Sequence, residues 1–251
     1  MSYSVDNLTL GKNVFISEKA KLVGKNIKIG DGTWIGDDVQ IIVDDLEIGD
    51  YCKIHNHTTI HGRKPMSIGH NAWIGQGTII DGLGGTKIGN NCGIGAYSQL
   101  WSHIRYGDPL AGCNYNSTKE LIVGDDVWFV GHCIVSPIIA RDKSMALVGS
   151  VITKDMEENH IYGGSPAKDL TDKIIPQFSE ISLSEKWMLF KDITIPESIV
   201  LVDNDGDILD DDRSYFNIAD RTYVKKSTHD EYEFMKQMQS KLFKFVPKEM
   251  L

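Results

Sequence analysis

The side chains best suited to proton transfer near neutral pH in this chain are its histidines. There are eight, at positions 55, 57, 61, 70, 103, 132, 160 and 229. An imidazole gains or loses its proton between about pH 5 and 8, so a positioned histidine can act as a general base, and its neutral form can bind a metal ion. Which of these chemistries applies depends on the elements that hold each histidine.

A six-residue hydrophobic repeat supplies those elements. Apolar anchors, many of them followed by glycine, recur at intervals of six and fall into triplets. The triplets are Leu10, Ile16, Leu22; Ile29, Ile35, Ile41; Ile48, Ile54, Ile60; Ile68, Ile74, Ile80; Ile88, Ile94, Leu100; Val123, Phe129, Val135; and, more weakly, Ala140, Ala146, Ile152. All irregular spacings fall between triplets, and the longest separates Leu100 from Val123. A fixed period of this kind indicates a solenoid.

Each six-residue unit is expected to form one short strand and one turn, so that three units complete one coil of a triangular prism. One coil cannot bury its own inner face, so several coils must stack. Extra residues are tolerated at only one corner, because elsewhere they would move all later anchors out of phase. We therefore predict an all-β solenoid, a parallel β-helix of about seven coils. An antiparallel sandwich would instead show a two-residue alternation.

The repeat argues against a metal site at the clustered histidines. His55 and His61 are six residues apart, so they occupy equivalent places on neighbouring faces of the prism. A metal ion needs several ligands directed at one point. We therefore expect no bound metal. By contrast, His61 and Asp81 share one register on successive coils, at the corner that also holds Arg63 and His103.

Three segments make the pattern more specific. They are VGDDVWFVGHCIVSP at residues 123–137, GSVITKD at 149–155 and GGSPAK at 163–168. In this order they resemble the end of the β-helix in the hexapeptide-repeat acyltransferases, a family that includes galactoside, maltose and serine acetyltransferases and bacterial sugar O- and N-acetyltransferases. The resemblance covers residues 10–173. It implies a left-handed parallel β-helix, a homotrimer, and transfer of an acetyl or similar acyl group from acetyl-CoA to a hydroxyl or amine.

The resemblance also implies site residues. The family places its catalytic histidine just before the coil with the tryptophan motif, and His103 occupies that position, three residues after Leu100. His103 is therefore predicted to be the general base. The predicted coenzyme-binding residues are Trp128, Gly131, Val148, Thr153, Lys154 and Lys168. Trp128 has a second interpretation, because Trp34 and Trp73 share its place in the repeat and the three could form a packing ladder. The family's phosphate-binding arginine is replaced by Thr171.

The acceptor is expected to be a sugar, a sugar nucleotide or a glycan, by analogy with the family. His61, Arg63 and Asp81 are candidate acceptor-binding residues. Galactoside-type members carry an asparagine below the base, where this chain has Gly75 beside Gln76, so galactoside specificity is not expected. Two alternatives stay open. One is an amino-acid or antibiotic acceptor, and the other is a non-catalytic β-helix scaffold or assembly protein.

Composition sets further limits. The formal net charge of −9 argues against nucleic-acid partners. No apolar stretch is long enough to span a bilayer, and the first ten residues do not resemble a secretory signal, so a cytoplasmic protein is expected. The β-helix domain is assigned to residues 1–173, with a long loop at 104–120.

Residues 174–251 are predicted to form a small α+β appendage, because the six-residue period stops there. Asn204-Asp205-Gly206 between β-branched runs predicts a hairpin turn. Thr228 and Glu231 predict a capping box that opens a helix. That helix is expected to bury residues at helical spacing: Tyr232, Met235, Met238 and Leu242.

Overall fold

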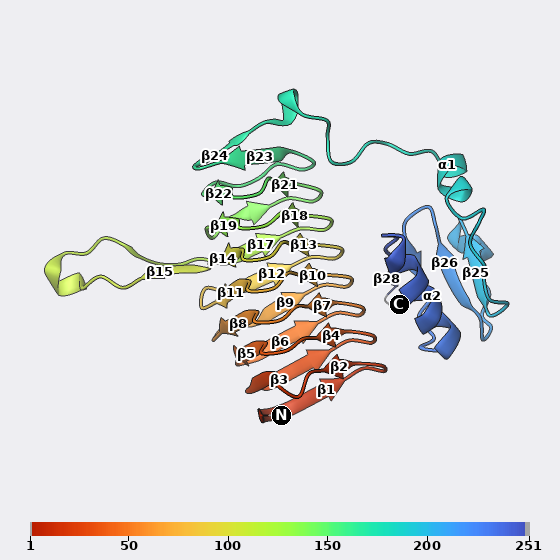
Figure 1. Ribbon diagram of the computed structural model, residues 1–251, viewed down its shortest axis with the longest axis horizontal. Coiled ribbons are helices and arrows are strands. Elements are labelled where there is room, and N and C mark those ends of the chain that lie inside the picture. Colours follow the sequence, from red (N-terminus) through yellow and green to blue (C-terminus); the bar gives the residue numbers. More distant parts are fainter. Residues whose placement is uncertain (1, 249–251) are drawn as a thin grey trace. The chain divides into compact units, whose positions relative to one another are not determined.

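The first unit of the chain is a three-faced parallel β-solenoid. The structure is a computed structural model, and it describes residues 2–248. Figure 1 shows short strands stacked along one axis and joined by turns at the corners. This unit ends at Phe178, and a second compact unit begins at Ser179. The predicted fold class, an all-β solenoid of parallel coils with a small α+β part at the C-terminal end, is confirmed.

The solenoid strands belong to three faces. The first face contains β1 (Ser2–Leu10), the second half of β3 (Lys21–Ile29), β6 (Asp45–Ile48), β9 (Met66–Ile68), β12 (Thr86–Ile88), β17 (Leu121–Val123) and β20 (Ile139–Ala140). The second face contains β2 (Phe15–Ile16), β4 (Trp34–Ile35), β7 (Lys53–Ile54), β10 (Trp73–Ile74), β13 (Gly93–Ile94), β18 (Trp128–Phe129), β21 (Met145–Ala146) and β23 (Ile161–Gly164), followed by antiparallel β24 (Ala167–Asp169). The third face contains the first half of β3, β5 (Gln40–Val43), β8 (Thr59–Gly62), β11 (Ile79–Gly82), β14 (Gln99–Leu100), β19 (Ile134–Val135) and β22 (Val151–Ile152). We name the corners by the faces that they join: the 1–2, 2–3 and 3–1 corners.

The anchors form the core, as the repeat predicts. From Leu22 to Ile152, every anchor side chain is at most 2% exposed. Equivalent anchors pair in register across coils, as Ile74 does with Ile54 below and Ile94 above. Leu10 is exposed and Ile16 only half-buried, because they belong to the first coil, at the open end of the stack. Burial of an aliphatic side chain contributes about 1.5–3 kcal/mol, so the ladder holds the coils together.

The irregular spacings lie at the 3–1 corner, where the predicted prism allows them. The number of coils differs from the prediction. The second face has eight parallel strands, because β23 adds a rung beyond the last anchor, Ile152. The anchor pattern alone could not show this rung, since the segment between β22 and β23 does not follow the six-residue spacing.

The long loop at 104–120 is an antiparallel arm that begins at His103. β15 (His103–Arg105) pairs with β16 (Asn116–Thr118), and the 3₁₀ helix η1 (Pro109–Ala111) forms the tip. The side chain of Asp108 caps that helix by accepting a hydrogen bond from the Leu110 N–H (2.8 Å). Figure 1 shows the arm projecting from the body of the solenoid.

The second unit has four strands and two helices. They are α1 (Leu183–Met188), β25 (Ile199–Val202), η3 (Asp205–Asp207), β26 (Ser214–Asn217), β27 (Thr222–Tyr223), α2 (His229–Ser240) and β28 (Val246–Pro247); the short η2 (Thr171–Lys173) closes the first unit. The predicted hairpin at Asn204 is wrong, because β25 and β26 are parallel. The Asn204 side chain accepts from the Gly206 N–H (2.9 Å) and starts a 3₁₀ turn, and the chain returns in the same direction.

The helix predicted after Thr228 is present as α2. The Thr228 hydroxyl accepts a hydrogen bond from the Glu231 N–H (3.2 Å), but the Glu231 carboxylate binds elsewhere, so only half of the capping box forms. Met235 and Met238 are buried as predicted. Leu242 is exposed, because α2 ends at Ser240. None of the helices within residues 2–248 is long and apolar enough to cross a membrane.

Candidate active site at the root of the arm

His103 lies at the 3–1 corner, where β14 ends and the arm begins. Its Nδ1 lies 2.8 Å from Oδ2 of Asp81, which β11 carries to the same corner. The ring of Trp101 packs against the imidazole edge to face, with the ring centroids 6.0 Å apart. The carboxylate and the indole together fix the orientation of the imidazole.

The Asp81 carboxylate is fully buried and well hydrogen-bonded. Its Oδ2 accepts from the N–H (2.9 Å) and the hydroxyl (2.7 Å) of Ser102. Burial alone would raise the pKa of Asp81, but the hydrogen bonds from His103 and Ser102 outweigh burial and hold the pKa below its usual value. An ionised carboxylate only accepts hydrogen bonds, so Nδ1 of His103 carries the ring proton. Nε2 keeps the lone pair that a general base needs.

This geometry changes the part assigned to Asp81. The sequence predicts an acceptor contact, but a fully buried carboxylate cannot touch an acceptor, whereas it can orient His103. Ser102 is the residue that the sequence did not indicate. It is fully buried, and its hydroxyl also accepts from the Gly84 N–H (2.8 Å), so it links Asp81 to the neighbouring turn.

His61 and Arg63 line a cavity of about 320 Å³ at the 3–1 corner, on the N-terminal side of Asp81. His61 pairs in register with Asp81, as predicted, and its Nδ1 lies 3.6 Å from Asp81 Oδ1. Arg63 is largely exposed and lies 3.4 Å from Asp44. Leu83 and the apolar residues of β5 complete the lining. One buried carboxylate therefore lies between two imidazoles, and one of these faces a cavity.

The residues predicted to bind coenzyme are not gathered in one place. Gly131 and Val148 lie in successive turns of the 2–3 corner, where the Gly149 N–H donates to the Gly131 carbonyl (2.9 Å). Thr153 and Lys154 follow β22 and lie at the 3–1 corner, and Lys168 is in β24. Val148, Thr153, Lys154 and Lys168 are exposed. Gly131 has a φ of +150°, a conformation that side chains rarely adopt.

Trp128 lies on the outer side of the second face and is 43% exposed. Its indole covers Gly93, where an added Cβ would lie 2.9 Å from the ring. Trp34 and Trp73 occupy the same column but do not stack on each other, because His55 lies between them with ring centroids 5.4 and 4.8 Å away. The packing ladder suggested for the three tryptophans is therefore interrupted, and Trp128 stands apart from it.

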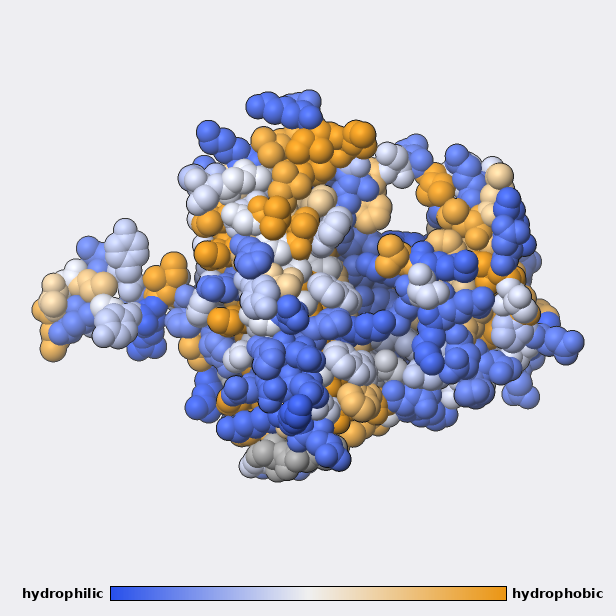
Figure 2. Space-filling model, viewed as in Figure 1, coloured by the Kyte–Doolittle hydropathy of each residue, from blue (hydrophilic) through white to orange (hydrophobic). Residues whose placement is uncertain are grey.

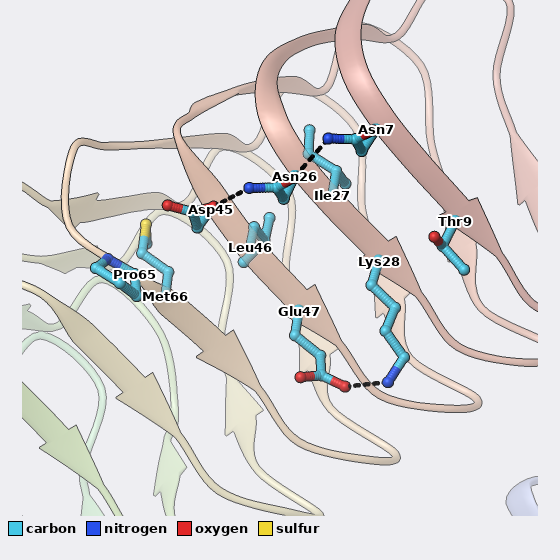
Figure 3. Close-up of a pocket in the computed structure, with 10 residues that line it drawn as sticks. All are labelled: Asn7, Thr9, Asn26, Ile27, Lys28, Asp45, Leu46, Glu47, Pro65 and Met66. Atoms are coloured by element: carbon cyan, nitrogen blue, oxygen red, sulfur yellow. Dashed lines mark hydrogen bonds and ion pairs between the residues drawn. The ribbon is translucent and has the colours of Figure 1, made fainter.

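A second hollow, of about 350 Å³, lies on the outer side of β1, β3 and β6 (Figure 3). Its polar side chains already bind one another: Asn7 donates to Asn26 (2.8 Å), Asn26 donates to Asp45 (2.5 Å), and Lys28 pairs with Glu47 (2.6 Å). It offers no general base. Within residues 2–248, no three His, Cys, Asp or Glu side chains are placed to hold a metal ion.

Comparisons with known proteins point to acyltransferases. No family model matches the chain. The bifunctional protein GlmU of Clostridium perfringens is 29% identical over 161 residues, which is 62% of this chain and 30% of that protein. A chloramphenicol acetyltransferase of Agrobacterium fabrum is 30% identical over 78 residues, which is 31% of this chain and 37% of that protein. The chain thus spans about a third of the length of these relatives.

Solved structures of the same fold include AntD, an N-acyltransferase from Bacillus cereus in complex with dTDP and coenzyme A. It is 20% identical, with a TM-score of 0.49, over 66% of this chain and 83% of that chain. A hexapeptide-repeat acetyltransferase from Vibrio cholerae, with acetyl coenzyme A, is 18% identical with a TM-score of 0.39, over 57% of this chain and 68% of that chain. The six-residue repeat, the β-helix and the sequence matches together show that the chain belongs to the hexapeptide-repeat acyltransferase family.

Proposed function

We propose that this chain transfers an acetyl or similar acyl group from acyl-coenzyme A to a hydroxyl or amine, with His103 as general base. The observation that carries the proposal is the buried Asp81 carboxylate, which holds Nδ1 of His103 at 2.8 Å and leaves Nε2 available. A structural histidine would not need an ionised partner that is fully buried and fixed by Ser102. A scaffold protein would have no use for this pair.

The chemistry requires little covalent participation, because a thioester is already reactive. Nε2 of His103 accepts the proton of the acceptor as its oxygen or nitrogen forms a bond to the thioester carbonyl carbon. The carbon–sulfur bond then breaks, and the thiolate takes the proton back from the imidazolium. Asp81 stabilises the imidazolium between these steps, since its carboxylate is 2.8 Å away. Orientation and proton transfer therefore supply the rate enhancement.

The coenzyme is proposed to lie along the 2–3 corner, past Gly131 and Val148. The exposed amines of Lys154 and Lys168 have the charge that its phosphates require. The backbone N–H groups beside Gly131 are proposed to bind the oxyanion that forms on the thioester carbonyl. The local backbone is compatible with this part, because Gly131 brings no side chain to the surface at a φ of +150°.

The active unit is proposed to be a homotrimer with sites between copies. Tyr97 lies in the turn below Gly131 and precedes His103 by six residues, so the two corners are up to about 20 Å apart in one chain. A coenzyme on the 2–3 corner therefore meets His103 most directly when a second copy supplies it. The arm supports this, because Tyr106 and Leu110 are fully exposed. Figure 2 shows apolar surface at the tip of the arm.

The acceptor is proposed to be a sugar, a sugar nucleotide or a glycan that enters beside His61. The cavity of about 320 Å³ lined by His61 and Arg63 is the nearest hollow to the base, and it combines apolar walls with two side chains that can donate hydrogen bonds. An antibiotic acceptor is the second candidate, because a chloramphenicol acetyltransferase is among the relatives.

The proposal is tested by measuring thiol release from acetyl-CoA with a panel of sugar nucleotides, simple sugars and chloramphenicol. A general base contributes about 10²–10⁴-fold, so His103→Ala should lose turnover on that scale. Its affinity for coenzyme A should stay near the native value, because the imidazole acts on the proton of the acceptor. His57→Ala is the matched control, since His57 is an exposed histidine at another corner.

The pH profile provides the second measurement. The native rate should fall toward acid as the imidazole gains a proton, and His103→Ala should lose this dependence. Near-native turnover in His103→Ala would mean that the base lies elsewhere. Absence of thiol release with every acceptor in the panel would favour the scaffold alternative.

A further inference from the structure

Two ring side chains occupy turn positions at which other coils have small or polar residues. At the 2–3 corner, the left-handed position is filled in successive coils by Asp38, His57, Gly77, Tyr97, His132 and Gly149. Tyr97 has a φ of 60° and His132 a φ of 50°, in a region that bulky residues rarely adopt. Their rings are stacked, with centroids 5.2 Å apart and planes 26° apart. Backbone strain of this kind tends to persist where a function requires it.

The neighbouring residues turn this ring pair into a surface. A Cβ at Gly77 would lie 2.6 Å from the Tyr97 ring, so the ring lies over Gly77 and a larger residue there would displace it. The Gln76 amide donates a hydrogen bond to the Tyr97 hydroxyl (3.1 Å). Gln76, Tyr97 and His132 are all exposed. We call these three residues the ring platform. It joins aromatic surface to an amide, a phenol and an imidazole.

We propose that the ring platform binds the sugar ring of the acceptor, an inference that rests on the proposed function. A pyranose has an apolar C–H face that packs on an aromatic ring and hydroxyls that bind an adjacent amide and phenol. The platform has both features in one place. It lies one coil below Gly131 and Val148, since His132 N–H donates to the Ala96 carbonyl and Gly149 N–H to the Gly131 carbonyl (both 2.9 Å).

The position favours the acceptor over the coenzyme. The proposed coenzyme path runs from Gly131 through Val148 toward the lysines at the C-terminal end of the solenoid. Tyr97 lies on the opposite side of Gly131, in the coil that ends at His103. A ligand on the platform is therefore on the far side of the thioester from the phosphates, at the level of the base. Only the group that receives the acyl chain belongs there.

The test compares Tyr97→Asn with the native protein. Asparagine tolerates the left-handed conformation, so this variant removes the ring without adding backbone strain. Saturation-transfer NMR is recorded with methyl α-D-glucopyranoside and methyl N-acetyl-β-D-glucosaminide as probes. Transfer should fall about tenfold in Tyr97→Asn, the loss expected for one aromatic contact. Tyr97→Phe keeps the ring and should lose less. His57→Asn changes the same turn position in a lower coil and should bind like the native protein.

Each result decides the matter. Absence of transfer in the native protein, or equal transfer in Tyr97→Asn, would overturn the platform. Loss of coenzyme A affinity in Tyr97→Asn would instead assign the rings to the adenine of the coenzyme, and a change in oligomeric mass would assign them to a subunit contact. Sugar binding without any acyl transfer would support the platform and contradict the proposed function. Acyl transfer with an unchanged KM for the acceptor in Tyr97→Asn would do the reverse.

Discussion

At the scale of single residues, the site depends on one buried carboxylate. Asp81 binds His103 and Ser102 and lies 3.6 Å from His61, so its charge orders residues from three coils. Its folded pKa lies below its usual value, and this fixes the sign of its contribution. Ionisation of Asp81 stabilises the fold above the pKa of an unfolded aspartate, and that contribution is lost as the pH falls through the lower folded pKa.

Asp81→Asn should reduce turnover by about 10²-fold, because an amide can leave the His103 imidazole in the wrong tautomer. The KM for acetyl-CoA should change little. Steady-state kinetics at neutral pH measure both. The control is Asp142→Asn, since Asp142 only accepts a hydrogen bond from the Asp125 N–H (2.9 Å), which an amide oxygen can also do. An unchanged turnover number in Asp81→Asn would show that His103 needs no partner.

The same pair of variants tests the sign of the linkage. The melting temperature of the native protein should exceed that of Asp81→Asn at neutral pH, and the difference should shrink as the pH falls below about 4. Calorimetry over a pH series gives this difference directly. A difference that grows toward acid would contradict a lowered pKa for Asp81.

Lys154→Ala tests the coenzyme end of the site. A ligand at 100 times its Kd adds about 2.7 kcal/mol to the free energy of unfolding, so coenzyme A should raise the melting temperature of the native protein. Loss of the exposed Lys154 amine should reduce this shift, and the reduction should be smaller at high salt, because exposed charges are screened. An identical shift in native and variant proteins would remove Lys154 from the coenzyme site.

At the scale of elements, the coils leave little room at their corners. A Cβ on Gly95 would lie 2.0 Å from the carbonyl oxygen of Val130, which belongs to the backbone of the next coil. Gly112 lies at the tip of the arm with a φ of +82° and open space around it. The two glycines therefore serve different purposes: one permits stacking and the other permits a turn.

Gly95→Ala should destabilise the solenoid by at least about 2 kcal/mol, which lowers the melting temperature by roughly 4–8 °C for a unit of this size. Gly112→Ala should leave that temperature almost unchanged, because strain in the arm does not disturb the stack. Differential scanning calorimetry compares the two. Equal effects would mean that the corner can relax to accept a Cβ.

The elements also show how far the sequence could predict the structure. The solenoid was predictable because each anchor, such as Ile54 or Ile74, points inward at a constant spacing, and the energy of burial imposes that spacing. The parallel pairing of β25 with β26 was not, because a turn at Asn204 has the same residues whether the chain reverses or continues. Asp81 could be placed beside His61, but its burial under Ser102 could not. Tyr97 could have been noticed as a ring in a turn position.

At the scale of the whole molecule, the proposed site needs two copies. In one chain, His103 and the coenzyme residues lie at different corners of the solenoid. A cyclic trimer gives each copy one neighbour on each side, so His103 of one copy can face the 2–3 corner of the next. A catalytic site within one chain would require the coenzyme to cross the whole third face.

Complementation between inactive variants separates these two possibilities. His103→Ala lacks the base but keeps the coenzyme channel. Val148→Trp keeps the base, and its new side chain should fill the channel without disturbing the core, because Val148 is 65% exposed. Each homotrimer should be nearly inactive. In trimers assembled at random from equal amounts, a site needs the base from the second variant and the channel from the first, so about a quarter of the sites should be intact.

The measurement is the rate of thiol release after the two variants are unfolded together and refolded, compared with each variant refolded alone. Recovery near a quarter of the native rate requires that His103 and Val148 of different copies form one site. Recovery of nothing, from a mixture that light scattering shows to be trimeric, would place the complete site within one chain. A monomer with full native activity would remove the trimer from the mechanism, and the exposed Tyr106 and Leu110 of the arm would then need another partner.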